Sequence, residues 1–273
     1  MRSLWISLLV VGLVGCVAGE PSMMGDDDPG PDPDPVDPPP MGDPSIEGTP
    51  VSSFETTSCS TSTVLALSKQ IAEEVNCMLP GQLVRFDETA HVQFSGSAVL
   101  PYLGEGARAD LYAAANRGGT VQVNSAFRTV VQQYLLRRWF ELGRCGITAA
   151  AEPGRSNHES GRALDLSNYG DWIGLFDDVG WAHDVPGDPV HFDHLASEDI
   201  RGADVLAFQR LWNRNAPDDQ IAEDGSYGPE TEARVRRAPA EGFGIGATCE
   251  SARNAPPLPV THGIADVPET CAD

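Results

Sequence analysis

The sequence predicts an α+β fold, because segments with the period of an α-helix and segments with the pattern of a β-strand occur along one 273-residue chain. Apolar side chains recur at helical spacing within residues 64–75, 107–115, 129–143 and 205–213. Strand-like patterns occur within residues 83–94, 162–166 and 190–194. Without the first 50 residues about 220 remain, enough for one medium-sized domain and one small one.

The helix at 129–143 has the clearest boundaries. Thr129 is a suitable N-cap, and Gly143 is a suitable terminating residue. The predicted buried stripe consists of Val131, Leu135, Trp139 and Leu142.

The most informative segment lies between these helices and contains two imidazoles and two carboxylates. Its first part is the pattern Ser156-x-His158-x-x-Gly161-x-Ala163-x-Asp165. Such a pattern arises by chance in roughly one in ten thousand chains of this length. A second part supplies Asp188 and His191. Two histidines and a carboxylate are a typical ligand set for a catalytic zinc ion, which keeps its fourth position open.

Strand alternation decides which of these side chains can meet. Ala163 and Asp165 face one side of the strand at 162–166, so Asp165 can point into a cleft. In the second strand His191 and His194 face opposite sides, and only one of them is expected to reach the metal. Asp188 precedes His191 by three residues, the position of a general base near the metal.

Other titratable residues near these motifs leave alternatives open. Glu152 and Glu159 are rival candidates for the base. The remaining histidines, His91, His183 and His194, are interpreted as structural or solvent-exposed, although His183 and His194 can also line the cleft.

These motifs resemble those of the LAS or M15 metallopeptidases, which include zinc D-alanyl-D-alanine carboxypeptidases and phage L-alanyl-D-glutamate endolysins. The resemblance implies a LAS/Hedgehog-type domain with an antiparallel sheet and flanking helices. It also implies one zinc ion bound by His158, Asp165 and His191, with Asp188 as catalytic base. Asp188 and Val190 replace the Glu and Trp of many carboxypeptidases, and in this respect the chain is more similar to the endolysins.

The resemblance also assigns substrate-binding residues and a reaction. An arginine at the position of Arg128 faces the substrate in the family, so Arg128 is the candidate for binding a peptide carboxylate or polarising the scissile carbonyl. Ser156 is a weaker candidate for a hydrogen bond to substrate. The expected activity is that of a D-alanyl-D-alanine carboxypeptidase. The alternatives are a murein endopeptidase and a non-catalytic peptidoglycan-binding lipoprotein with a structural zinc site.

The N-terminal segment predicts export from the cytoplasm. Residues 1–15 resemble a bacterial lipoprotein signal peptide, and Cys16 is then the lipidated first residue of the mature chain. Residues 16–50 form an expected disordered tether, with ten prolines and nine acidic residues between Glu20 and Pro50. In a polyproline II conformation the stretch from Glu20 to Pro50 reaches up to roughly 95 Å. We therefore expect a lipid-anchored protein of the bacterial cell envelope, on the periplasmic face of a membrane, expected to be the outer membrane, or at the cell surface.

The C-terminal part resembles a second known unit. Residues 51–198 are assigned to the peptidase domain, and residues 199–248 resemble a three-helix peptidoglycan-binding type 1 module. This resemblance predicts that residues 199–248 bind the cell wall. Their removal is expected to leave hydrolysis of a small soluble muropeptide largely intact. Residues 249–273 form a tail.

Charge and cysteine content limit the partners and the compartment. The formal net charge of −22 makes nucleic acid and anionic membrane surfaces poor partners. Six cysteines in an exported chain indicate disulfides. Cys59 and Cys77 flank a helix about 25 Å long and are not expected to pair with each other. Cys77 is expected to pair with Cys145, and Cys249 with Cys59 or Cys271.

Overall fold

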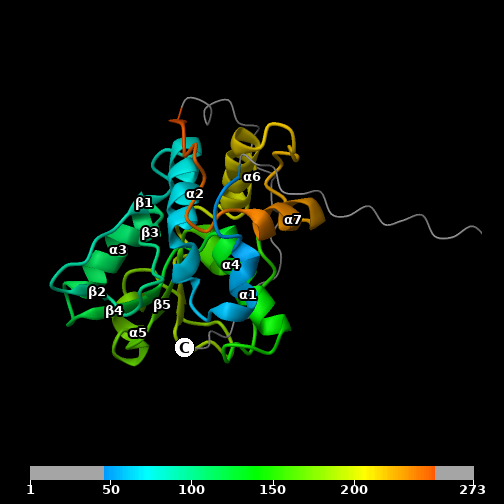
Figure 1. The fold of residues 1–273 in the computed structure, drawn as a ribbon. Helices are drawn as coiled ribbons and strands as arrows, with labels where there is room; N and C mark the ends of the chain where they lie inside the picture. The colour runs from blue at the N-terminus through cyan, green and yellow to red at the C-terminus, as the bar shows by residue number, and fades with distance from the viewer. Residues whose placement is uncertain (1–45, 250–273) are drawn as a thin grey trace, which may run out of the picture. The chain divides into compact units, whose positions relative to one another are not determined.

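The helices and strands of the computed structural model, which describes residues 46–249, follow the periodic patterns of the sequence (Figure 1). The α-helices are α1 (Phe54–Thr57), α2 (Leu65–Met78), α3 (Glu105–Ala115), α4 (Val130–Glu141), α5 (Ile173–Asp177), α6 (Ala203–Asn215) and α7 (Pro229–Arg237). The strands are β1 (Val84–Arg85), β2 (Val92–Phe94), β3 (Tyr102–Leu103), β4 (Val121–Ser125), β5 (Ala163–Leu166) and β6 (His191–Asp193). Four 3₁₀-helices are η1 (Val51–Ser53), η2 (Thr61–Val64), η3 (Asn157–Ser160) and η4 (Tyr169–Asp171). The α+β class is confirmed.

The main sheet has the strand order β2-β4-β5-β6. Its β4–β5 and β5–β6 pairs are antiparallel, but β2 and β4 are parallel. The main sheet is therefore mixed, and two of its three strand pairs have the expected antiparallel direction. Parallel neighbours need a crossover connection, and the chain supplies one through β3 and α3. A separate two-stranded sheet pairs β1 with β3.

One face of the main sheet is closed by helices. Leu164 and Leu166 of β5 are fully buried in an apolar cluster with residues of α3 and α5. Because side chains alternate along a strand, Ala163 and Asp165 point to the opposite face. The sheet thus leaves one of its faces available to polar side chains.

Helix α4 has the predicted N-terminus but ends earlier than predicted. The Thr129 side chain and Gln132 form a reciprocal capping box at its start. Leu142 is 44% exposed and does not belong to the buried stripe, because the helix ends at Glu141. Gly143 follows with a φ of 62°, the left-handed conformation that terminates many helices.

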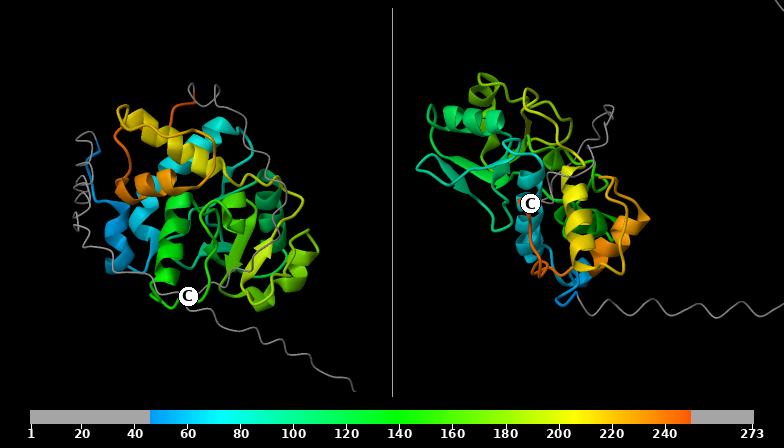
Figure 2. Two further views of the ribbon diagram at one scale, coloured as in Figure 1. Left: turned by 90° about the vertical axis from the view of Figure 1, so that its right-hand side faces the viewer. Right: turned by 90° about the horizontal axis from the view of Figure 1, so that it is seen from above.

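A second apolar cluster joins α2 and α4 to α6 and α7, and α2 and α6 lie side by side (Figure 2). From α6 it includes Phe208, Leu211 and Trp212. Glu74 of α2 is fully buried and accepts hydrogen bonds from Arg210 and Arg214 of α6. Residues of the predicted C-terminal module therefore share a core with helices of the predicted peptidase domain.

Truncation before Asp199 is accordingly expected to unfold the protein. It removes three large core side chains, each contributing about 2–5 kcal/mol, and leaves the buried Glu74 without its arginines. Their sum is comparable with the total stability of an ordinary domain. Circular dichroism during heating measures this directly. A truncated chain that still melts cooperatively above about 45 °C would contradict the prediction.

Two disulfides connect distant parts of the described chain. Cys59 pairs with Cys145, and Cys77 pairs with Cys249. Cys59 and Cys77 do not pair, as predicted, but both predicted partner choices for Cys77 and Cys249 were wrong. Helical packing explains the difference: Cys59 lies beside the loop that follows α4, whereas the end of α2 approaches the segment that follows α7.

Several predictions concern segments outside the described residues. The signal peptide at 1–15, the lipidation site Cys16, most of the tether and Cys271 belong to them. The last residues of the predicted tether contact the body of the protein, where Pro50 forms a β-bridge with Pro239. Within residues 46–249 no helix is both long and apolar enough to cross a membrane.

Candidate metal centre

Three short elements bring the predicted metal ligands together. Asp165 of β5 lies directly opposite His191 of β6 in the sheet register. His158 belongs to η3. The Ser156 hydroxyl caps the N-terminus of this helix by accepting a hydrogen bond from His158 N at 3.2 Å. Gly161 ends η3 with a φ of 74°, which lets the chain turn from His158 into β5.

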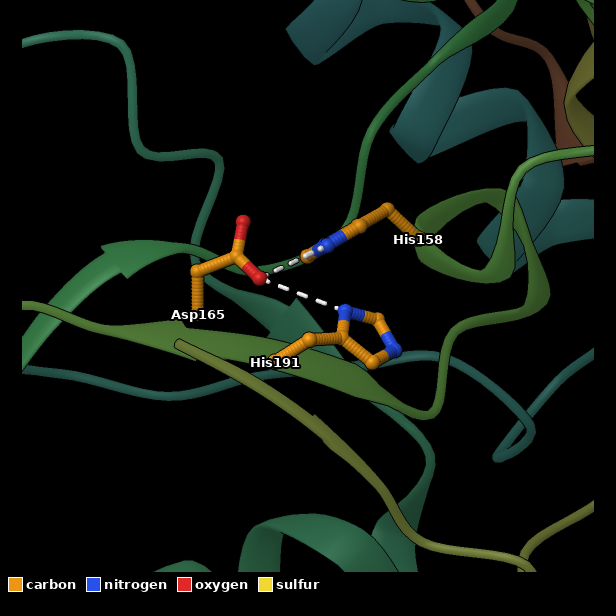
Figure 3. A group of neighbouring side chains, drawn as sticks. All are labelled: His158, Asp165 and His191. Atoms are coloured by element: carbon orange, nitrogen blue, oxygen red, sulfur yellow. Dashed lines mark hydrogen bonds and ion pairs between the residues drawn. The ribbon is translucent and has the colours of Figure 1, made fainter. Parts of the chain in front are cut away.

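The three side chains converge on one point (Figure 3). His158 Nε2 and His191 Nδ1 each lie 3.2 Å from Asp165 Oδ1. All three potential ligand atoms lie within 4.8 Å of one another, and all three residues are buried. A zinc ion about 2.1 Å from each ligand places tetrahedral ligands about 3.4 Å apart. The observed spacing fits such an ion, so this group can hold a metal.

The other ring nitrogens of the histidines also have partners. His158 Nδ1 lies 2.8 Å from the Ala126 carbonyl oxygen. His191 Nε2 lies at ion-pair distance from Asp193 Oδ2, 3.1 Å, and this oxygen accepts a hydrogen bond from the Asn157 side chain. Metal-binding histidines characteristically donate their second N–H to a carbonyl or a carboxylate. These contacts orient both rings so that His158 Nε2 and His191 Nδ1 face the metal position.

Asp193 was missed in the sequence, although a signal for it was present. It lies two residues beyond His191 in the same strand, and strand alternation places the two side chains on one face. His194 lies on the other face, where its ring nitrogens contact Asp110 and Ser197.

The electrostatics of the group favour charged forms. Burial raises the pKa of Asp165, but His158 and His191 outweigh this effect and hold it well below its ordinary value. Burial lowers the pKa of His191, yet hydrogen bonds to Asp165 and Asp193 raise it well above its ordinary value. The surroundings of His191 thus attract positive charge, as a cation site requires.

Asp188 occupies the turn that leads into β6. Its backbone carbonyl accepts a hydrogen bond from His191 N, and the residue is only 2% exposed. The His183 ring supports this turn through a 2.7 Å contact between Nε2 and the Pro189 carbonyl oxygen.

The rival bases have other contacts. Glu152 forms an ion pair with Arg137 at 2.7 Å. Glu159 is fully buried, and its carboxylate accepts hydrogen bonds from Gly154 N and Ser156 N as part of the η3 cap. Both carboxyl groups are therefore engaged with groups other than the three metal ligands.

Arg128 lies beside the metal ligands at a pocket of about 350 Å³. Its guanidinium donates to Gln133 Oε1 at 2.9 Å and lies 3.8 Å from Asp165 Oδ2. Arg128 is 7% exposed, and both Arg128 and Asp165 line the pocket. Ser156 is fully buried and lies 3.4 Å from Arg128 Nη1, so its contacts in this structure are with the cap and the arginine.

A pair of buried carboxyl groups connects η3 to α6. Burial raises the pKa of Glu159 and, to about 7, that of Asp204. Their side-chain hydrogen bond requires one of them to be protonated, and it raises the pKa of Glu159 while it lowers that of Asp204.

Asp204→Asn is expected to raise the free energy of unfolding at about pH 8 by about 1–4 kcal/mol and to change it little near pH 4. The folded-state pKa of about 7 exceeds the ordinary value of 3.8. The neutral carboxyl therefore stabilises the fold fully below about pH 4, and this contribution is lost as the pH rises through 7. Urea unfolding at both pH values measures the difference. An equal effect at both would rule out Asp204 as the titrating group.

No protein-family model matches the chain, and no curated protein is significantly similar to it in sequence.

Proposed function

We propose that this protein is a zinc peptidase that hydrolyses an amide bond in the stem peptides of peptidoglycan. The observation that carries the proposal is the buried group of His158, Asp165 and His191, whose two rings are oriented by Ala126 and Asp193. An adjoining pocket with a buried arginine supplies a place for an anionic peptide. The resemblance of the motifs to the LAS or M15 metallopeptidases supports the choice of zinc and of substrate.

A zinc ion bound there supplies a Lewis acid and lowers the pKa of water at its open position. Side chains of the protein carry out the proton transfers and bind the substrate. A carboxylate oxygen of Asp188 takes a proton from the attacking water and returns it to the leaving amine. The Arg128 guanidinium binds a substrate carboxylate or stabilises negative charge on the scissile carbonyl oxygen.

The cell envelope is the proposed location. Export with a lipid on Cys16 and a tether to residue 50 carries the peptidase to its substrate, and residues 199–248 add wall affinity through their resemblance to a peptidoglycan-binding module. Their shared core with α2 and α4 is compatible with wall binding by their outer surface.

D-alanyl-D-alanine carboxypeptidase remains the first candidate, and Arg128 provides a test. Arg128→Lys is expected to keep the metal while kcat/KM falls by roughly 10 to 10², because lysine cannot form a bidentate pair with a terminal carboxylate. Amidating the C-terminus of the substrate is expected to slow the unmutated enzyme far more than the variant.

Equal cleavage of amidated and free peptides by the unmutated protein would exclude the carboxypeptidase and favour an endopeptidase, whose site is remote from that terminus. Absence of hydrolysis of either peptide by zinc-loaded protein would favour a non-catalytic wall-binding lipoprotein.

A further inference from the structure

We infer that the protein has a second catalytic site, in which Ser197 is a nucleophile that takes up the acyl group of a carboxylic ester. Its partners are His194 and Asp110, and these three residues are here called the α3 triad. This activity goes beyond the proposed peptidase and does not depend on it. His194 follows His191 by three residues and points to the opposite face of the strand, away from the metal ligands.

The first support is a chain of hydrogen bonds in the order that an activated serine requires. His194 Nδ1 lies 2.8 Å from Ser197 Oγ, and His194 Nε2 lies 3.0 Å from Asp110 Oδ2. An ionised carboxylate only accepts hydrogen bonds, so it holds the ring proton on Nε2. The lone pair of Nδ1 then faces the Ser197 hydroxyl, which is the position of a base for this serine.

The second support is that the surrounding chain holds the base and the nucleophile in place. Ser197 N donates to the His194 carbonyl oxygen at 3.0 Å, so one tight turn carries both residues. His194 N donates to the Arg162 carbonyl oxygen at 2.8 Å, and the centroid of its ring lies 5.2 Å from that of Trp181. Because His194 is also only 3% exposed, its ring is fixed before a substrate arrives.

The third support is that Ser197 lies at the surface beside the start of α3. Ser197 is half-buried, and the neighbouring Leu195 is 58% exposed. Ala107 N donates to Ser197 Oγ at 3.0 Å, which places this oxygen at the first turn of the helix. The first N–H groups of a helix have no acceptor within it, so those of Glu105 and Gly106 are suited to stabilise negative charge on a carbonyl oxygen.

Two glycines keep side chains away from Ser197 Oγ. A Cβ atom at Gly106 would lie 3.3 Å from this oxygen, and one at Gly104 would lie 3.4 Å from it. A larger residue at either position would crowd the hydroxyl. The proposed substrate class is therefore a carboxylic ester with a small acyl group such as acetyl, which needs little room beside the helix.

The proposed reaction transfers the acyl group first to Ser197 and then to water. His194 Nδ1 takes the hydroxyl proton while Oγ forms a bond to the carbonyl carbon. The bond between that carbon and the alcohol oxygen breaks, and His194 returns the proton to the leaving alcohol. Water, deprotonated by His194, then hydrolyses the acyl-serine and restores the free hydroxyl. Water is the only co-reactant.

Covalent labelling of the full chain tests the site. Diisopropyl fluorophosphate forms an oxygen–phosphorus bond to an activated serine and releases fluoride, and peptide mass spectrometry identifies the labelled residue. We expect the label on Ser197, and we expect the chain to hydrolyse p-nitrophenyl acetate. His194→Ala is expected to lower both rates by about 10² or more, the scale for losing a general base.

Two glycine variants separate access to Ser197 from effects on stability. Gly106→Val places a side chain beside Ser197 Oγ and is expected to lower both rates by about tenfold or more. Gly174→Val is the matched control, because Gly174 is likewise the second residue of a helix, α5. An added Cβ atom at Gly174 meets no atom within 4 Å, so this variant is expected to keep both rates.

Asp110 acts through His194 as a positioning residue, and nitrogen NMR of the His194 ring tests this role. Asp110→Asn is expected to lower the population of the tautomer with its proton on Nε2, because an amide can donate to Nε2 as well as accept from it. Asp110→Glu restores a carboxylate and is expected to restore this tautomer. An unchanged tautomer in Asp110→Asn would contradict the role.

An unlabelled Ser197 in the folded chain would overturn the inference, and so would labelling that His194→Ala leaves unchanged. Removal of zinc with a chelator is expected to change neither rate. Ester hydrolysis that disappears with the zinc would belong to the metal centre and would also overturn the inference. The proposed peptidase is tested separately, by cleavage of a muropeptide.

Discussion

His191→Ala is expected to reduce the metal content of the protein from about one ion per chain to nearly none. The substitution removes one of three ligands from a buried group in which every ligand atom faces the same point. It also leaves Asp193 without the imidazole that it orients. Metal analysis after dialysis against a low concentration of zinc measures the loss.

His194→Ala is the matched control, because His194 is also buried and also contacts a carboxylate. It lies on the opposite face of the strand, so its variant is expected to keep the metal. Equal loss in both variants would mean that destabilisation, and not ligand removal, accounts for the result.

Asp188→Asn is expected to retain zinc and to lower turnover by about 10² or more, the usual scale for losing a general base. Asparagine preserves the size of the side chain and the backbone hydrogen bond from His191 N, so the turn before β6 is expected to persist. The measurement is kcat on a soluble muropeptide, with zinc content determined on the same sample. Near-normal turnover would move the role to Glu152, Glu159 or another group.

The group of His158, Asp165 and His191 was predictable because the local sequence pattern determines where these side chains lie. The spacing from His158 to Asp165 includes one tight turn at Gly161 and one strand, and both are readable from the residues. Strand alternation separated His191 from His194 for the same reason. Asp193 follows the same rule, because alternation places it on the face of the strand that carries His191.

Features that depend on distant parts of the chain were not predictable in this way. The disulfide partners are set by how the loop after α4 and the segment after α7 return to the helices. Likewise, the periodicity of α6 indicated one apolar face, yet Asp204 and Arg210 on its other sides are buried too. Arg210 has its partner in Glu74, which lies 136 residues away in sequence, and Asp204 meets the buried Glu159.

The most direct test of the proposed peptidase is mass spectrometry of one defined muropeptide incubated with the zinc-loaded protein. We expect two products whose masses together equal the substrate plus one water, cleaved at a single amide bond, and almost no products with Asp188→Asn. An intact substrate after prolonged incubation with folded, zinc-loaded protein, or products formed equally well by the Asp188→Asn variant, would contradict it.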